Sequence, residues 1–117
     1  MTAGTYDITI EQGATFTRTL TWKDENEDAV NLTGYSARLQ MRESVEAVDT
    51  FIDITSGNSP DDIALGGAAG TIIIAISATT TAALTQGGVY DLELVSGAGV
   101  VTRLLQGNVT LSKEVTR

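Results

Sequence analysis

The sequence predicts an all-β fold in which two antiparallel sheets pack face to face as a β-sandwich. Apolar and polar residues alternate with a period of two along most of the chain, and helical periodicity is nearly absent. Turn signals recur about every ten residues, which is typical of sandwiches and barrels. The 117 residues suit a single domain, and no linker or internal repeat divides them. We therefore expect one domain over residues 1–117 with seven or eight short strands.

The first half of the chain contains four expected strands. Each has an apolar residue at every second position and is bounded by turn residues: 6–11, 15–23, 36–43 and 50–55. In 36–43 the alternation is regular and places Arg38 and Arg42 on the polar side, as in an antiparallel sheet with one wet face. In 15–23 the apolar side is interrupted by Arg18, so this strand is expected to lie partly open or to pair its arginine.

The second half contains the remaining strands and one helical turn. The expected strands are 63–65, 71–77, 90–95 and 100–111. Segment 71–77 is apolar on both sides, which indicates a central strand. Residues 78–84 are expected to form the helical turn, capped by Ser77 or Thr79. Gly107 is expected to mark a bulge in the last strand.

The order of these elements favours an immunoglobulin-like sandwich. A strand, a short helical crossing and a Gly-rich corner lead to Tyr90 at the start of the next strand, as at the corner of immunoglobulin-like domains. The chain contains no Cys, so no disulfide spans the sheets, and Trp22 lies too early to copy the antibody pattern. The predicted fold class is thus an immunoglobulin-like, two-sheet antiparallel β-sandwich of seven or eight strands with one short helical turn, and the order of the strands is not predicted.

The composition argues against an enzyme and against a cofactor or metal site. The chain has no His and no Cys, which removes the commonest general base and the commonest metal ligands. The run 24–28 opens like a calcium loop, but Ala29 and Tyr35 stand where that motif requires Gly and Glu, so a solvated hairpin tip is favoured over a weak cation site. The outward pair Asp91 and Glu93 invites comparison with glycosidase carboxylates, yet such residues on a wet sheet face ordinarily serve hydration.

The net charge of -8 argues against nucleic acid as a partner, because phosphate binding needs clustered Lys and Arg. No apolar run reaches the roughly 18 residues of a membrane helix, so membrane insertion is not expected. The first residues lack the basic and apolar regions of a signal peptide, so synthesis and retention in the cytosol are expected.

Protein contact is the activity that remains. Arg38, Arg42 and Arg103 are three of only seven basic residues, and they either pair locally with carboxylates or anchor a neighbouring subunit. Tyr35 follows a turn and is expected at the surface, so it joins the arginines as a candidate contact residue. The terminal segments 6–11 and 109–115 are expected to offer strand edges for β-augmentation.

The segment Val30 to Arg42, with its Leu32-Thr33-Gly34-Tyr35 turn, resembles a segment of small tailed-phage and prophage structural proteins. The order of elements is similar to the N-terminal sandwich domain of siphophage upper-baseplate proteins. This resemblance implies a non-catalytic virion structural protein, a tail or baseplate component. It also implies a virion location, other virion proteins as partners and a homo-oligomer within the assembly.

Two alternatives stay open beside the tail or baseplate component. The first is a capsid decoration or cement protein. The second is a cell-surface carbohydrate-binding module, which would need exposed aromatic platforms. The candidates for such platforms are Tyr6, Trp22, Tyr35 and Tyr90, of which all except Tyr35 fall at core positions of the alternation.

Overall fold

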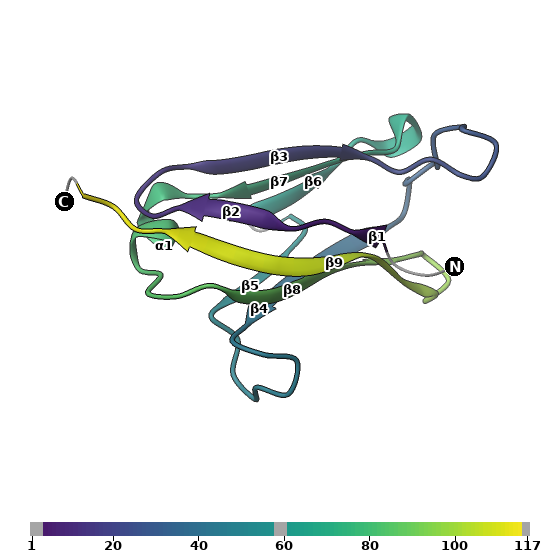
Figure 1. The fold of residues 1–117 in the computed structure, drawn as a ribbon. Helices are drawn as coiled ribbons and strands as arrows, with labels where there is room; N and C mark the ends of the chain where they lie inside the picture. Colours follow the sequence, from purple (N-terminus) through teal and green to yellow (C-terminus); the bar gives the residue numbers. More distant parts are fainter. Residues whose placement is uncertain (1–3, 58–60, 116–117) are drawn as a thin grey trace.

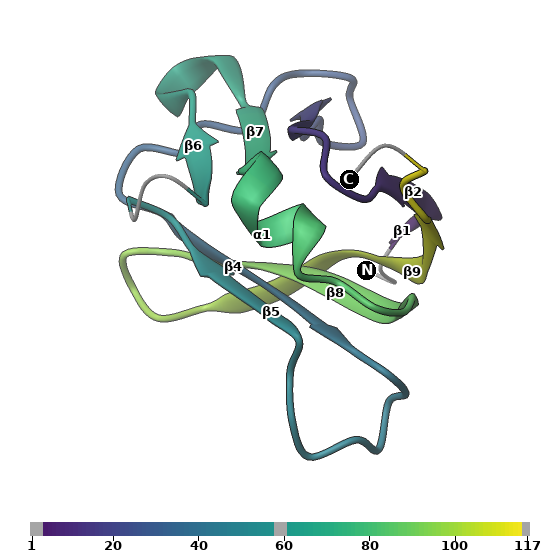
Figure 2. The same ribbon diagram turned by 90° about the vertical axis from the view of Figure 1, so that its left-hand side faces the viewer.

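Two β-sheets pack against each other in the computed structural model, which describes residues 4–57 and 61–115 (Figures 1 and 2). The larger sheet has six strands in the order β1-β9-β8-β4-β5, and β2 also pairs with β9. Its strands are β1 (Gly4–Thr5), β2 (Ile8–Glu11), β4 (Ser36–Arg42), β5 (Ile52–Thr55), β8 (Gly88–Val95) and β9 (Val101–Ser112). The smaller sheet has the order β3-β7-β6, built from β3 (Phe16–Thr21), β7 (Thr71–Ile76) and β6 (Asp62–Leu65). The predicted two-sheet sandwich is confirmed.

The N-terminal edge differs from the prediction in two ways. The edge is split into two strands, because β2 covers only residues 8–11 of the expected strand 6–11 and an unexpected strand, β1, precedes it at Gly4–Thr5. This brings the described strands to nine, and both β1 and β2 run parallel to β9. The split occurs where Asp7 turns its Oδ1 atom to accept the Asn108 N–H at 2.9 Å. Tyr6, expected in the core, is 38% exposed. A side-chain acceptor thus replaces one rung of the backbone ladder.

The core lies between the sheets and follows the alternation read from the sequence. In β4 the side chains of Ala37, Leu39 and Met41 are buried, and their neighbours point outward. The central position of β7 in its sheet is confirmed, and its Ile72 and Ile76 side chains are fully buried. The other buried apolar residues include Ile10, Phe16, Leu32, Ile52, Ile54, Ile63, Leu84, Leu92, Leu94 and Val109. The buried side chains of the two sheets interdigitate, and this packing holds the sheets together without a covalent cross-link.

The end of the sandwich between β7 and β8 is closed by α1 (Ala78–Ala82), as Figure 2 shows. The Ser77 hydroxyl oxygen accepts the Thr80 N–H at 3.3 Å, so the predicted N-cap is confirmed with Ser77 as the capping residue. Leu84 follows the helix and is buried in the core. A short 3-10 helix, η1 (Gly67–Ala69), connects β6 to β7.

The predicted bulge at Gly107 is wrong. The register between β8 and β9 shifts between Leu92 and Glu93, which pair with Leu105 and Arg103, so the inserted residue of β9 is Leu104 and not Gly107. Gly107 lies directly opposite Tyr90, and a Cβ atom there would collide with the carbonyl group of Tyr6. The glycine is needed for close approach of the N-terminal segment and not for an inserted residue.

Candidate functional site

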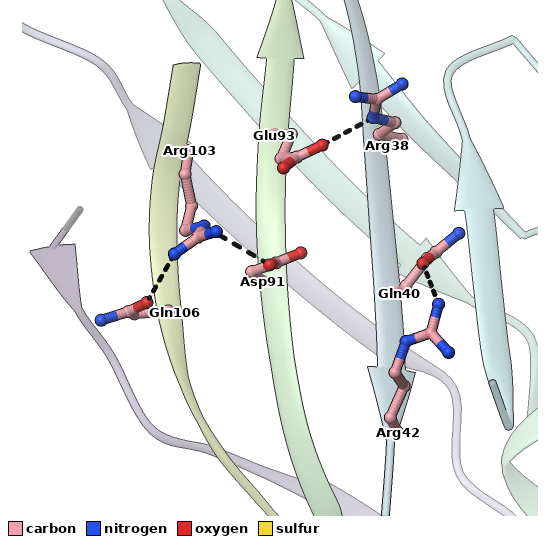
Figure 3. Close-up of polar contacts among 7 residues, drawn as sticks. All are labelled: Arg38, Gln40, Arg42, Asp91, Glu93, Arg103 and Gln106. Atoms are coloured by element: carbon pink, nitrogen blue, oxygen red, sulfur yellow. Dashed lines mark hydrogen bonds and ion pairs between the residues drawn. The ribbon is translucent and has the colours of Figure 1, made fainter. Parts of the chain in front are cut away.

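The outer face of the larger sheet collects three of the four predicted contact residues. Arg38 and Arg42 project from β4, and Arg103 projects from β9 on the far side of β8 (Figure 3). The strand register places Arg38 and Arg103 on either side of Glu93. Asp91 lies between Gln40 and Gln106 in the same way. We call this surface the arginine–acid face: Arg38, Gln40, Arg42, Asp91, Glu93, Arg103 and Gln106.

Two ion pairs cross the arginine–acid face. The Arg38 Nε atom lies 2.7 Å from Glu93 Oε1, with the two side chains 49% and 24% exposed. The Arg103 Nε atom lies 3.5 Å from Asp91 Oδ2, and its Nη1 atom lies 3.5 Å from Gln106 Oε1. Exposed pairs of this kind contribute about 0–1 kcal/mol to stability, so folding alone gives little reason for them.

Arg42 differs from the other two arginines in the groups that its side chain binds. Its Nη1 atom donates to the carbonyl oxygens of Ala47 at 2.9 Å and Val48 at 2.7 Å. Its Nη2 atom donates to Gln40 Oε1 at 3.0 Å. Arg42 therefore holds the loop of residues 43–51, which joins β4 to β5 and projects from the body of the sandwich (Figure 2).

The loop held by Arg42 presents two apolar side chains to solvent. Val45 is 82% exposed and Val48 is 90% exposed. Val45 borders a shallow, open depression of about 400 Å³ on the arginine–acid face, together with Arg38, Arg42, Val89, Asp91 and Glu93. Sequence reasoning missed these valines, because segment 43–49 shows no alternation that would give its side chains a direction.

Asp91 carries an electrostatic penalty in this position. Burial against the sheet and the neighbouring Glu93 raise the pKa of Asp91 above its ordinary value of 3.8, and the opposing effects of Arg103, Arg42 and Arg38 are smaller. The charged carboxylate is thus held where the folded chain disfavours it. Residues with shifted pKa values are enriched at functional surfaces, and structural ion pairs cause such shifts as well.

Tyr35, the fourth predicted contact residue, is not part of the arginine–acid face. Its ring meets Trp22 edge to face, with centroids 6.0 Å apart and planes at 89°, and both rings pack against the core. Tyr90 is buried. Of the aromatic candidates for a carbohydrate platform, only Tyr6 is classed as exposed in the described part of the chain.

Two carboxylates outside the arginine–acid face, Asp24 and Asp61, have structural roles. Asp24 Oδ1 accepts the N–H groups of Asn26 at 2.9 Å and Asp28 at 3.1 Å and so shapes the tip of its hairpin. Asp61 accepts the Ser77 N–H at 2.7 Å and the Thr80 hydroxyl at 2.6 Å. Burial alone would raise the pKa of Asp61, but these hydrogen bonds outweigh it and bring the pKa below the ordinary value.

Two further features were sought in the described ranges 4–57 and 61–115. No three His, Cys, Asp or Glu side chains there cluster closely enough to hold a metal ion. No helix there is long and apolar enough to span a membrane.

Comparison with known proteins gives matches at the level of structure only. No protein-family model matches the chain, and no curated protein matches it in sequence. Among solved structures, the chain is similar to the extracellular domain of the voltage-gated sodium channel β4 subunit, described as a parallel homodimer with a role in cell–cell adhesion. That match has a TM-score of 0.50 at 14% identity and covers 98% of this chain and 97% of the other. A second structure, from work on cell-adhesive interactions of sodium channel β subunits, has a TM-score of 0.48 at 14% identity over 96% and 93% of the two chains.

The structural match supports the immunoglobulin-like fold class, and it contradicts the prediction of a phage virion component. The sodium channel β4 match is to an extracellular domain with a role in cell–cell adhesion, and not to a phage protein. The segment that suggested a phage protein is explained by local structure: Leu32 is a core residue and Gly34 takes a φ of +83° in the turn before β4. A positive φ favours glycine in any fold, so the glycine of this turn does not identify a family.

Proposed function

We propose that the chain is a non-catalytic, protein-binding immunoglobulin-like module that self-associates through its arginine–acid face. The observation that carries this proposal is the mixed charge of that face, on which arginines and carboxylates alternate across β4, β8 and β9 (Figure 3). A surface that presents both signs can pair with a copy of itself about a two-fold axis, as symmetric dimers require.

The charge of the whole molecule favours this face over the others. The chain has a net charge of -8, so two copies repel each other at most orientations. On the arginine–acid face three arginines stand against two carboxylates, and Asp53 on β5, opposite Gln40, brings the balance to zero. Contact through this face therefore avoids the repulsion that most other contacts would meet, and it aligns opposite charges.

The loop of residues 43–51 supplies the apolar contact that a charged face lacks. Val45 and Val48 are almost fully exposed, and full burial of either side chain in a partner contributes about 1.5 kcal/mol. Arg42 holds the loop in place before binding, so its ordering costs less at the moment of association. The reported homodimer of the sodium channel β4 domain supports the same mode of action for this fold.

The test uses a pair of complementary charge variants. Arg38→Glu/Arg103→Glu makes the face acidic, and Asp91→Lys/Glu93→Lys makes it basic. We expect the wild-type chain to self-associate with rising concentration, from 12.3 kDa toward twice that mass, and more weakly at high salt. Each variant alone should stay monomeric, and an equimolar mixture of the two should form a heterodimer, as measured by sedimentation velocity.

The matched control reverses charges away from the face. Glu25→Lys/Glu27→Lys, at the tip of an exposed hairpin, changes the net charge as much as the basic variant does and should self-associate at least as well as wild type. A wild-type chain that remains monomeric at millimolar concentration, or a variant mixture that does not associate, would rule out this face as the binding surface.

A further inference from the structure

One strand of the smaller sheet has a free edge. β3 is the outermost strand of the order β3-β7-β6, and β2, the strand before it in the chain, pairs instead with β9 of the other sheet. In Figure 1, β3 runs along the upper layer and β2 lies below it, beside β9. Among residues 4–57 and 61–115, no strand pairs with the outer side of β3. In the expected edge 109–115, Val109 is paired on both sides, by β2 and by β8, whereas Thr110, Leu111 and Ser112 pair with β2 alone.

The register of β3 shows which backbone groups point outward. The Trp22 N–H donates to the Gly70 carbonyl at 2.9 Å, which makes this opposed pair a hydrogen-bonded one. Hydrogen-bonded and non-bonded pairs alternate in an antiparallel ladder, so Thr17, Thr19 and Thr21 direct their N–H and C=O groups away from β7. Their side chains are exposed on the outer face of the sheet. This edge therefore offers three donors and three acceptors at regular spacing.

Beside this edge lies an unsatisfied arginine. Arg18 points toward the inside of the sandwich, with its Cζ atom 4.8 Å from the centroid of the Phe16 ring. Its Nε atom is buried and has no hydrogen-bond partner, the single case of this kind among side-chain nitrogens and oxygens in the described residues. A buried N–H without an acceptor is costly, and a native structure ordinarily supplies a partner.

A recess between β2 and β3 gives access to this part of the molecule. It has a volume of about 210 Å³, and its lining includes Thr9 and Glu11 from β2 and Phe16, Thr17 and Arg18 from β3. Most of the exposed lining is polar, which suits a polypeptide backbone better than an apolar ligand.

We infer that the free edge of β3 binds an extended segment of a partner protein by strand addition, with an acidic side chain of that segment accepting a hydrogen bond from Arg18. Only another extended backbone matches the spacing of the outward groups of Thr17, Thr19 and Thr21. A carboxylate matches a guanidinium in geometry and charge. The site is separate from the arginine–acid face, so its existence does not depend on self-association there.

The alternative interpretation is that Arg18 prevents other strands from pairing with the free edge of β3. Inward-pointing charges on edge strands discourage accidental pairing, because an added strand would bury the charge without a partner. The two readings differ in one measurable respect. A guard rejects every added strand, whereas a recognition residue accepts a strand that carries a carboxylate and rejects one that does not.

The test is a titration of the full ¹⁵N-labelled chain with three synthetic peptides. The first, acetyl-Thr-Val-Thr-Glu-Thr-Val-Thr-amide, places a glutamate among inward positions and threonines outside; the other two carry glutamine or lysine in place of the glutamate. With the glutamate peptide we expect shifts and exchange protection at the amides of Thr17, Thr19 and Thr21, and a shift of the Arg18 Hε signal. It should bind about tenfold more tightly than the lysine peptide.

A variant separates recognition from protection. Arg18→Leu should reduce the preference for the glutamate peptide over the lysine peptide to near unity. Three results would overturn the proposal: equal binding of all peptides by the wild-type chain, shifts confined to strands other than β3, or tighter binding of every peptide by Arg18→Leu. The last result would identify Arg18 as an edge guard.

Discussion

The Tyr90 hydroxyl donates a hydrogen bond to the backbone carbonyl of Tyr6, which lies 84 residues earlier in the chain. The Tyr90 side chain is buried on β8, so this bond fastens the N-terminal edge to the middle of the larger sheet. The tyrosine corner of immunoglobulin domains bonds a few residues upstream, and here the bond instead crosses to the first strands. Tyr90 was singled out from its position in the sequence. It secures the N-terminal edge of the larger sheet, whose pairing with β9 the sequence did not predict.

Replacing Tyr90 by Phe should lower the free energy of unfolding by about 1–2 kcal/mol at neutral pH, because the Tyr6 carbonyl loses its donor. The wild-type chain should also show an alkaline loss that the variant lacks. Burial, with Tyr6 and Asp7 nearby, raises the pKa of Tyr90 from 10.0 to about 12. The neutral hydroxyl stabilises the fold fully below pH 10.0, and this stabilisation is lost as pH rises toward 12.

The measurement for Tyr90 is urea unfolding between pH 7 and 12, followed by Trp22 fluorescence. Tyr35→Phe removes a hydroxyl elsewhere and is the matched control, which should keep the alkaline loss. If Tyr90→Phe lost stability above pH 10 as steeply as wild type, the hydrogen bond to Tyr6 would not be the cause.

At the scale of elements, α1 is fastened to the turn between β2 and β3 by one buried side chain. The Thr81 hydroxyl donates to the Ala14 carbonyl at 2.8 Å and accepts the Gly13 N–H at 3.1 Å, and Thr81 is 0% exposed. Gln12 adds a second link, since its Nε2 atom donates to the Leu84 carbonyl at 2.7 Å. The helix is too short to be stable alone, so these contacts hold it in place.

Thr81→Val keeps the shape of the side chain and removes its hydrogen bonds. We expect it to lower the free energy of unfolding by about 1–3 kcal/mol, because the partly buried Ala14 carbonyl and Gly13 N–H lose their partner. Thr81→Ser keeps the hydroxyl and is the matched control. Amide hydrogen exchange at Gly13 should accelerate in the valine variant and stay slow in the serine variant; equal exchange in both would contradict this role.

The alternation in the sequence predicts which side of a strand is buried, but not which strand lies beside it. Arg38 and Arg42 could be placed on one outward face because they are four residues apart in a regular alternation. Their meeting with Arg103 depends on the pairing of β4 and β9 with β8, over distances that local patterns do not encode. The split of the first strand at Asp7 depends likewise on a contact with Asn108.

Loop geometry limited the prediction of the candidate site. Arg42 was expected to pair with a carboxylate or to anchor a neighbouring subunit, yet it binds carbonyl groups of its own loop, whose conformation no periodicity describes. Tyr35 was expected at the surface because it follows a turn. It is instead half-buried against Trp22, whose position depends on the pairing of β3 with β7.

At the scale of the whole molecule, the arginine–acid face is a balanced region on an acidic protein. Charges scattered over a surface contribute little to folding, but charges arranged with alternating sign select a partner and an orientation. Burial and the neighbouring Glu93 raise the pKa of Asp91, so the folded chain disfavours its charge. A residue of this kind is expected to matter more for association than for stability.

Asp91→Asn tests this separation of binding from folding. The pKa of Asp91 is raised in the folded chain, so its charge lowers stability as pH rises through that pKa, and protonation relieves the penalty as pH falls. The variant should therefore be at least as stable as wild type at pH 7, with the difference shrinking toward pH 4, as measured by thermal unfolding. Its self-association at pH 7, measured by sedimentation, should be weaker, because the arginines of a second copy lose one acceptor. A variant that is less stable and associates normally would show instead that Asp91 serves the fold, through its pair with Arg103, and has no part in binding.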